Sequence, residues 1–256
     1  GMKVYIFADL EGISGIGNGE YVNGRPKFVE LGAAFMAGDI NSCVAGCFDA
    51  GATEVIVRDG HGASGVNVDP SRIDPRAELI QGETPGVRFA DFQGSDALIL
   101  LGYHAMAGTA GALLEHSYSS EGYQNLWLNG RPAGEIGIDA AIAAEYGVPV
   151  ALVTGDDKAC LEAEAWIPGV TTCQVKRSYH TRSSRVLIPE VAHRLIREKT
   201  AFSLKHLPEP VRIDYPATLR REYVERQMVP VGNGYVQIDG RTVERTGNSV
   251  EELLLT

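Results

Sequence analysis

Four apolar runs rich in β-branched residues are spaced along the first 155 residues of the chain. They are Val4–Ala8, Thr53–Arg58, Ala97–Tyr103 and Pro149–Thr154. Such runs are typical of strands, and the segments between them have a helical period. The alternation predicts an α/β fold in which a mostly parallel sheet carries helices on both faces.

The segment between the first two runs predicts a long helix over residues 28–50, ended by Gly51. Its apolar positions fall on one side: Leu31, Phe35, Ile40, Val44 and Phe48. A helix of this kind supplies the right-handed crossover that two parallel strands require. Further helices are expected at Gly134–Tyr146, Asp156–Trp166 and Pro189–Leu204.

The hydrophobic pattern changes after Pro208 from helices to strands. The expected elements are strands at Val211–Tyr215 and Tyr235–Val243 and a short final helix after Ser249. Earlier in the chain, Asn129-Gly130 predicts a hairpin turn. We expect an α/β core of residues 2–155 and a smaller α/β C-terminal part of residues 156–256, with the boundary near Gly155.

Composition narrows the class of protein. The chain has 33 acidic and 23 basic residues and a net charge of −10, which disfavours nucleic acid as a partner. The longest stretch without charge, Ala97–Leu114, contains Gly102 and His104, so a strand followed by a loop explains it better than a membrane span. Four cysteines without a C-x-x-C pair favour a reducing compartment, and the apolar run before Asp9 is too short for a signal-peptide core. We expect a cytoplasmic protein that does not bind a membrane.

Acidic and histidine side chains follow three successive predicted strands. They are Asp9 and Glu11 after the first, Asp59 and His61 after the second, and His104 after the third. In a parallel sheet these points lie at the carboxyl edge, where α/β proteins bind ligands. Glu135, at the start of a predicted helix, could approach the same edge.

This set of oxygen and nitrogen donors suits Zn²⁺ and tolerates Mn²⁺ or Co²⁺. Five ligands are too many for one catalytic zinc with an open position, so two metals bridged by a carboxylate use them better. Two carboxylates about 4 Å apart repel by about 4 kcal/mol at an effective dielectric constant of about 20, which cations would relieve. The alternative is structural: an aspartate after a strand is often a turn or helix-cap residue, and a single histidine is often hydrogen-bonded within a loop.

Two further groups of residues allow more than one interpretation. His116 is a candidate general base, nucleophile or hydrogen-bond donor, or a loop histidine without a catalytic role. His180 lies in a basic run that could receive a substrate carboxylate or form a solvated patch. The basic residues of that run are Lys176, Arg177, Arg182 and Arg185. The sequence contains no G-x-x-x-x-G-K-[ST], H-E-x-x-H or G-x-S-x-G motif, and the glycines after Glu11 do not spell G-x-G-x-x-G.

Five motifs, in order along the chain, resemble those of the DppA-type D-aminopeptidases, a family of zinc metallopeptidases. They are Asp9-Leu10-Glu11-Gly12-Ile13-Ser14-Gly15, Asp59-Gly60-His61, Leu101-Gly102-Tyr103-His104-Ala105, His116-Ser117 and Gly134-Glu135-Ile136-Gly137. The resemblance covers about residues 3–204, and five separate motifs in order are specific.

The resemblance implies a centre of two Zn²⁺ ions per subunit with a catalytic role for His116. The implied ligands are Asp9, Glu11, His61, His104 and Glu135, with Asp9 as the bridge. It also implies a ring-shaped homo-oligomer, a decamer, that admits short peptides and releases N-terminal residues such as D-Ala. Two other functions stay open at this point: a metal-dependent amidase or phosphoesterase acting on another small molecule, and a non-catalytic metal-dependent binding module.

Overall fold

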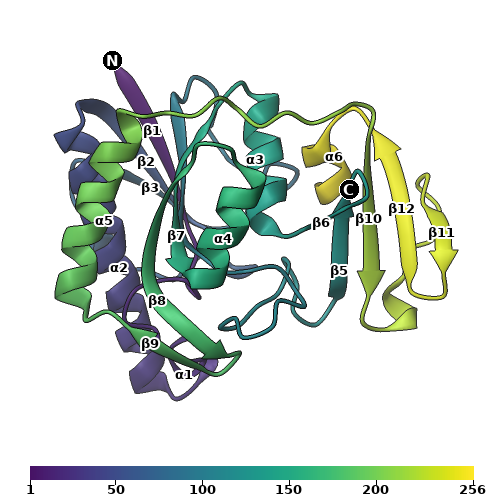
Figure 1. The fold of residues 1–256 in the computed structure, drawn as a ribbon, viewed down its shortest axis with the longest axis horizontal. Coiled ribbons are helices and arrows are strands. Elements are labelled where there is room, and N and C mark those ends of the chain that lie inside the picture. Colours follow the sequence, from purple (N-terminus) through teal and green to yellow (C-terminus); the bar gives the residue numbers. More distant parts are fainter.

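The larger part of the protein is a seven-stranded sheet (Figure 1). A computed structural model describes residues 1–256, and the strand order is β3-β2-β1-β4-β7-β8-β9. All neighbouring pairs are parallel except β8 with β9. The bounds are β1 Met2–Ala8, β2 Ala52–Asp59, β3 Glu78–Ile80, β4 Ala97–Tyr103, β7 Val150–Asp156, β8 Thr171–His180 and β9 Ser183–Val186. The four strands predicted from the apolar runs form its centre, and the mostly parallel sheet is confirmed.

Helices cover both faces of this sheet, as expected. One face packs against α2 and α5, and the other packs against α3 and α4. In β1, Val4 and Ile6 belong to the core under α2, while Tyr5 and Phe7 belong to the core under α3, because successive side chains of a strand point to opposite faces. The bounds are α1 Glu20–Asn23, α2 Pro26–Asp49, α3 Glu135–Glu145, α4 Asp157–Trp166 and α5 Pro189–Leu204.

Helix α2 is long and apolar enough to cross a membrane by length and composition. Its most apolar window is 50% buried inside the protein, where Ile40 and Val44 pack in the core and α5 lies alongside. A central core helix is expected to have this composition, since both the sheet and a second helix cover it.

The second sheet is antiparallel, has five strands in the order β11-β12-β10-β5-β6 and lies to the right in Figure 1. The predicted hairpin at Asn129-Gly130 joins β5 to β6, and both residues have positive φ, 51° and 78°, as this turn requires. The bounds are β5 Tyr123–Leu128, β6 Arg131–Ala133, β10 Ala217–Tyr223, β11 Val236–Asp239, β12 Thr242–Gly247 and α6 Val250–Leu255. Short 3-10 turns lie at Pro70–Arg72 and Arg226–Met228.

The C-terminal strands differ from the prediction. Val211–Tyr215 forms no strand: Val211 and Ile213 pack against the core under α3 without regular secondary structure, and the strand begins only at Ala217. The segment Tyr235–Val243 contains a turn at residues 240–241, which divides it into β11 and the start of β12. Apolar alternation indicates which side chains are buried, but a strand also needs a neighbour for its backbone hydrogen bonds.

The two sheets divide the chain differently from the expected boundary near Gly155. Gly155 lies within β7, and α4, β8, β9 and α5 complete the first sheet after it. The second sheet takes β5 and β6 from residues 123–133 and its other strands from residues 217–247. Gly155 lies near the carboxyl end of the central strand β7, and the chain then crosses over through α4 to the next parallel strand, β8.

The loop after β1 passes so close to the end of β4 that only glycine fits at position 12. The Gly12 amide donates to the Gly102 oxygen at 2.8 Å, and a Cβ atom there would lie 1.9 Å from the Tyr103 oxygen. Gly12→Ala therefore displaces the loop, and we expect the free energy of unfolding to fall by about 1–3 kcal/mol in a denaturant titration. Gly17→Ala is the control, because its Cβ would meet atoms no closer than 3.7 Å. Equal stability of the two variants would contradict the close-approach explanation.

Candidate metal centre

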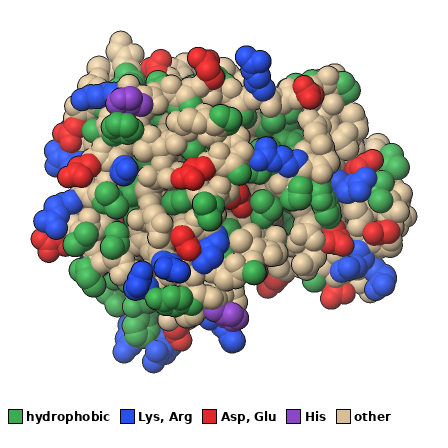
Figure 2. All heavy atoms as spheres, in the orientation of Figure 1, with side chains coloured by type: hydrophobic (Ala, Val, Ile, Leu, Met, Phe, Trp, Pro, Cys, Tyr) green, Lys and Arg blue, Asp and Glu red, His purple; other side chains and the backbone are tan.

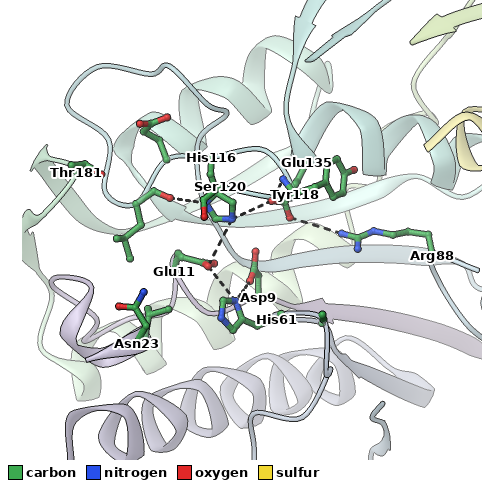
Figure 3. A pocket seen from close by; sticks show the side chains of 16 residues that line it. Asp9, Glu11, Asn23, His61, Arg88, His116, Tyr118, Ser120, Glu135 and Thr181 are labelled. Atoms are coloured by element: carbon green, nitrogen blue, oxygen red, sulfur yellow. Dashed lines mark hydrogen bonds and ion pairs between the residues drawn. The ribbon is translucent and has the colours of Figure 1, made fainter. Parts of the chain in front are cut away.

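Three of the predicted residues come together because their strands are neighbours. Ala8 of β1 pairs with Asp59 of β2 on one side and with Leu101 of β4 on the other, so the strand ends lie in one row. Asp9, His61 and His104 follow these ends, and Figure 3 shows Asp9 and His61 close together at the cavity. This is the carboxyl edge of the parallel sheet, as the sequence predicted.

The first group of candidate ligands is Asp9, Glu11 and His61, whose donor atoms lie within 4.8 Å of one another. His61 Nδ1 is 3.0 Å from Asp9 Oδ1 and 3.2 Å from Glu11 Oε1. Both carboxylates are buried, and His61 is partly exposed to the cavity. Two carboxylate oxygens and one imidazole nitrogen form a donor set typical of zinc.

The second group is Asp9, His104 and Glu135, all of them buried. His104 Nε2 is 3.2 Å from Asp9 Oδ2 and 2.9 Å from Glu135 Oε2. Glu135 is the first residue of α3, after the hairpin of β5 and β6, so it reaches the edge from the hairpin side as expected. Asp9 belongs to both groups, with one oxygen toward each.

The hydrogen bonds of His104 favour a cation at this place. His104 Nδ1 lies 3.1 Å from the Ala105 oxygen and donates to it, so Nε2 carries the lone pair of the neutral ring. Nε2 and Glu11 Oε2 are buried without a hydrogen-bond partner. Lone pairs that face one another in a buried site need a proton or a metal ion between them. The five residues therefore fit a metal centre by donor type, burial and orientation.

The charges in the site shift the pKa values of its histidines and of its glutamates in opposite directions. Burial lowers the pKa of His61, but hydrogen bonds to Asp9 and Glu11 outweigh it and raise this pKa to about 11. At His104 burial also lowers the pKa, but the charge of Glu135 outweighs burial and raises this pKa well above its ordinary value. Burial raises the pKa of Glu11 and Glu135, yet the histidines lower both below the ordinary range. Without metal the site therefore holds protons that a divalent cation displaces on binding.

His116, in the loop between β4 and β5, forms a third group of possible ligands with Glu11 and His104. Its ring stacks on His104 with centroids 3.9 Å apart, and its Nδ1 lies 2.8 Å from the Leu114 oxygen. Because Nδ1 donates to that oxygen, Nε2 presents a lone pair to the site, 3.9 Å from Glu11 Oε1 and 3.7 Å from Glu135 Oε2. Leu114 has a positive φ of 51°, which is strained backbone next to this histidine.

Asp59, which the sequence grouped with the others, does not join the cluster. Its carboxylate is buried and accepts hydrogen bonds from the Asn67 amide at 2.6 Å, the Val68 amide at 3.1 Å and the Gln81 side chain at 2.9 Å. It therefore holds the loop after His61 in place. This is the structural alternative that applies to an aspartate at a strand end.

A cavity of about 630 Å³ opens over the centre (Figure 3). Its lining includes Asp9, Glu11, His61, His116 and Glu135, while His104 lies beneath them. On the face shown in Figure 2, basic and acidic side chains are interspersed.

The sequence missed a buried lysine that holds the loop of Glu11. The Lys176 ammonium donates to the backbone oxygens of Glu11 at 2.7 Å, Ile13 at 2.9 Å and Ile16 at 2.8 Å. Burial lowers the pKa of Lys176 to about 7. Asp39 accepts from the Ser14 amide at 2.8 Å, so the loop is held from both sides. Of the basic run that was expected as one group, Lys176 is buried and Arg177, Arg182 and Arg185 are exposed.

Fold and site together define an α/β protein with a carboxylate and histidine centre at the carboxyl edge of its parallel sheet. The family model of the peptidase M55 D-aminopeptidases matches residues 2–256. The chain is 39% identical over 209 residues to the D-aminopeptidase of Bacillus subtilis (strain 168). The aligned residues cover 80% of this chain and 74% of that protein. The chain also resembles a solved structure, the Zn-dependent D-aminopeptidase DppA from Bacillus subtilis, a self-compartmentalizing protease. That comparison has a TM-score of 0.90 and 32% identity and covers 98% of this chain and 94% of that one.

The chain belongs to the M55 D-aminopeptidase family of peptidases. The resemblance carried by the five sequence motifs is confirmed. The family match also extends through the residues after Leu204, where the motifs gave no sign of it.

Lys176→Met tests the lysine that holds the Glu11 loop. The substitution leaves three buried carbonyl oxygens without their donor, and each costs about 1–3 kcal/mol. We expect a lower free energy of unfolding and a dissociation constant for Zn²⁺ that is raised about tenfold or more, measured by competition with a chromophoric chelator. Lys158→Met is the matched control: its ammonium contacts the Ser178 oxygen and Asp157, away from this loop. A Zn²⁺ affinity unchanged by Lys176→Met would rule out the positioning role.

Glu162 generates a prediction for the pH dependence of stability. Burial raises its pKa to about 7, Oε1 accepts from the Met106 amide at 2.8 Å, and Oε2 has no partner. The folded protein thus keeps a proton that the unfolded chain loses at its ordinary pKa of 4.5, and stability falls as pH rises between these values. Glu162→Gln removes the ionisation, so its stability relative to the parent protein should rise by up to about 3 kcal/mol above about pH 7 and change little below about pH 4.5. The melting temperatures of both proteins across this range test it; a difference independent of pH would contradict it.

Proposed function

We propose that this protein is a zinc-dependent aminopeptidase that removes N-terminal residues, D-amino acids such as D-Ala, from short peptides through a two-metal centre. The observation that carries the proposal is the pair of donor groups that share Asp9. Zinc and the D-residue preference are supported by the similarity to the Bacillus subtilis D-aminopeptidase and to the solved Zn-dependent D-aminopeptidase DppA.

Two cations suit these donors better than one. Asp9 directs Oδ1 toward His61 and Oδ2 toward His104, so each oxygen serves a different group. The three carboxylates of Asp9, Glu11 and Glu135 balance most of the charge of two divalent ions. When bound, zinc supplies Lewis-acid polarisation of the scissile carbonyl and lowers the pKa of a water molecule.

His116 would transfer a proton from the attacking water to the leaving amine. Because its Nδ1 donates to the Leu114 oxygen, Nε2 is free to accept a proton from the attacking water and to deliver it to the leaving amine. The stack on His104 fixes the ring plane, which keeps Nε2 turned toward the carboxylates. A direct attack by Nε2 on the carbonyl is the other role open to this atom, and it would leave an acyl group on the histidine.

We further propose that the protein acts as a ring-shaped homo-oligomer in the cytoplasm. The support is the description of the solved relative as a self-compartmentalizing protease. Enclosure of the cavity within such a ring would limit the substrates to short peptides.

The test combines metal analysis with single substitutions. Purified protein should contain about two Zn²⁺ ions per chain by mass spectrometry and should release D-Ala from D-Ala-D-Ala only before chelation. We expect His104→Ala to lose both zinc and activity, because it removes a ligand. His116→Ala should keep zinc and lose about 10²–10⁴-fold in kcat, because it removes only the proton carrier.

His206→Ala, at an exposed position, is the control for both histidine substitutions. Full activity of His104→Ala would contradict the metal centre. Preferential hydrolysis of phosphate esters or other amides would point to a different hydrolase, and retained zinc without any hydrolysis would point to a binding module. Mass spectrometry of quenched reactions decides between the two roles of His116, since only direct attack leaves an acylated chain.

A further inference from the structure

One permanently charged basic side chain lines the cavity over the metal centre. Arg88, from the segment between β3 and β4, is the only lysine or arginine among the 16 residues that line it. The acidic lining residues are Asp9, Glu11, Glu115 and Glu135. With Asp9, Glu11 and Glu135 engaged as candidate metal ligands, Arg88 is the lining side chain that can bind a substrate carboxylate as a fixed cation.

Contacts with Asp139 and Phe7 hold the side chain of Arg88 rigidly. Its Nε and Nη2 atoms each donate to Asp139 at 2.9 Å, and its guanidinium lies 4.3 Å over the ring of Phe7. Asp139 is fully buried and also accepts from the hydroxyl groups of Tyr103 at 2.6 Å and Tyr118 at 3.0 Å. The arginine is thus preorganised, so a ligand would not have to order a flexible side chain.

Part of the guanidinium remains available to a ligand. Of its five N–H groups, two bind Asp139, and Nη1 has no hydrogen bond within the protein. Nη2 lies 3.9 Å from Glu135 Oε1, and Figure 3 shows the guanidinium pointing toward Glu135 from one side of the cavity. The free N–H groups therefore lie next to the candidate metal ligands.

The position of Arg88 suits the carboxylate of a dipeptide. One residue spans at most about 3.6 Å, so a dipeptide with its scissile carbonyl at the metal centre carries its carboxylate about one such step beyond that carbonyl. Arg88 lines the same cavity as Glu135 and lies next to it, so a carboxylate one residue beyond the scissile bond stays near the guanidinium. In a longer peptide the carboxylate would lie further along the peptide. In a dipeptide amide a neutral amide group would take the place of the carboxylate.

We propose that Arg88 binds the C-terminal carboxylate of a dipeptide substrate and thereby sets a preference for dipeptides with a free C-terminus. The proposal rests on the proposed aminopeptidase function. The guanidinium makes two charge-assisted hydrogen bonds to the carboxylate, and the second edge of the same group stays on Asp139.

The experiment compares D-Ala-D-Ala with its C-terminal amide. In the parent protein we expect kcat/KM for the acid to exceed that for the amide by about 10- to 100-fold, chiefly through a lower KM. The double variant Arg88→Met, Asp139→Asn removes the cation without leaving a buried unpaired carboxylate. Its kcat/KM values for the acid and for the amide should be about equal. Asp139→Asn alone is the matched comparison: it alters the same buried network but retains the guanidinium, so a preference for the acid should remain, reduced to the extent that Asp139 holds the arginine in place.

Binding of a dipeptide with a reduced, uncleavable bond, as acid and as amide, provides a readout independent of turnover. Calorimetry of the zinc-loaded protein should show a preference for the acid that the double variant loses. Equal affinity of the parent protein for acid and amide, or a preference for the acid that the double variant keeps, would overturn the role of Arg88. If the parent protein hydrolyses neither substrate, the aminopeptidase function is contradicted, and the binding measurement still decides whether Arg88 holds the carboxylate.

Discussion

The structure depends on the convergence of three buried carboxylates and two imidazoles at one edge of a parallel sheet. Asp9, Glu11 and Glu135 would repel one another strongly in a site with little water, and His104 Nε2 is buried with a lone pair that finds no hydrogen-bond donor. Protons on the imidazoles relieve part of this repulsion, and divalent cations between the donor atoms would satisfy all of these groups at once. The surrounding structure holds them in place against their repulsion: Lys176 binds the backbone of the Glu11 loop, and Arg88 neutralises Asp139 one helical turn beyond Glu135.

Much of the fold and most of this cluster could be predicted from sequence because both rest on local patterns. A buried parallel strand is a continuous apolar run, and Asp9, His61 and His104 follow such runs directly. Neighbouring parallel strands end at the same edge, so residues that are far apart in sequence are expected together. The same rule also included Asp59, because the pattern indicates where a strand ends and not which way the next side chain turns.

The remaining features depend on contacts that no local pattern encodes. Lys176 lies 165 residues from Glu11 and stands among exposed arginines, so its sequence context predicts a surface lysine. Arg88 and Asp139 form their pair across 51 residues, from a loop and a helix. Val211–Tyr215 has the composition of a strand but packs without a strand partner. Burial of a charge, like pairing of a strand, is decided by a distant partner.

The segment between β4 and β7 links the second sheet to the metal centre. In a simple parallel crossover a helix alone joins the two strands. Here the connection first forms the loop of His116, then the β5–β6 hairpin, and only then α3, whose first residue is Glu135. The hairpin is held on its other side by β10, from the C-terminal region. The antiparallel sheet thus anchors the hairpin that lies between the loop of His116 and Glu135, so the C-terminal strands stabilise the site without contributing a side chain to it.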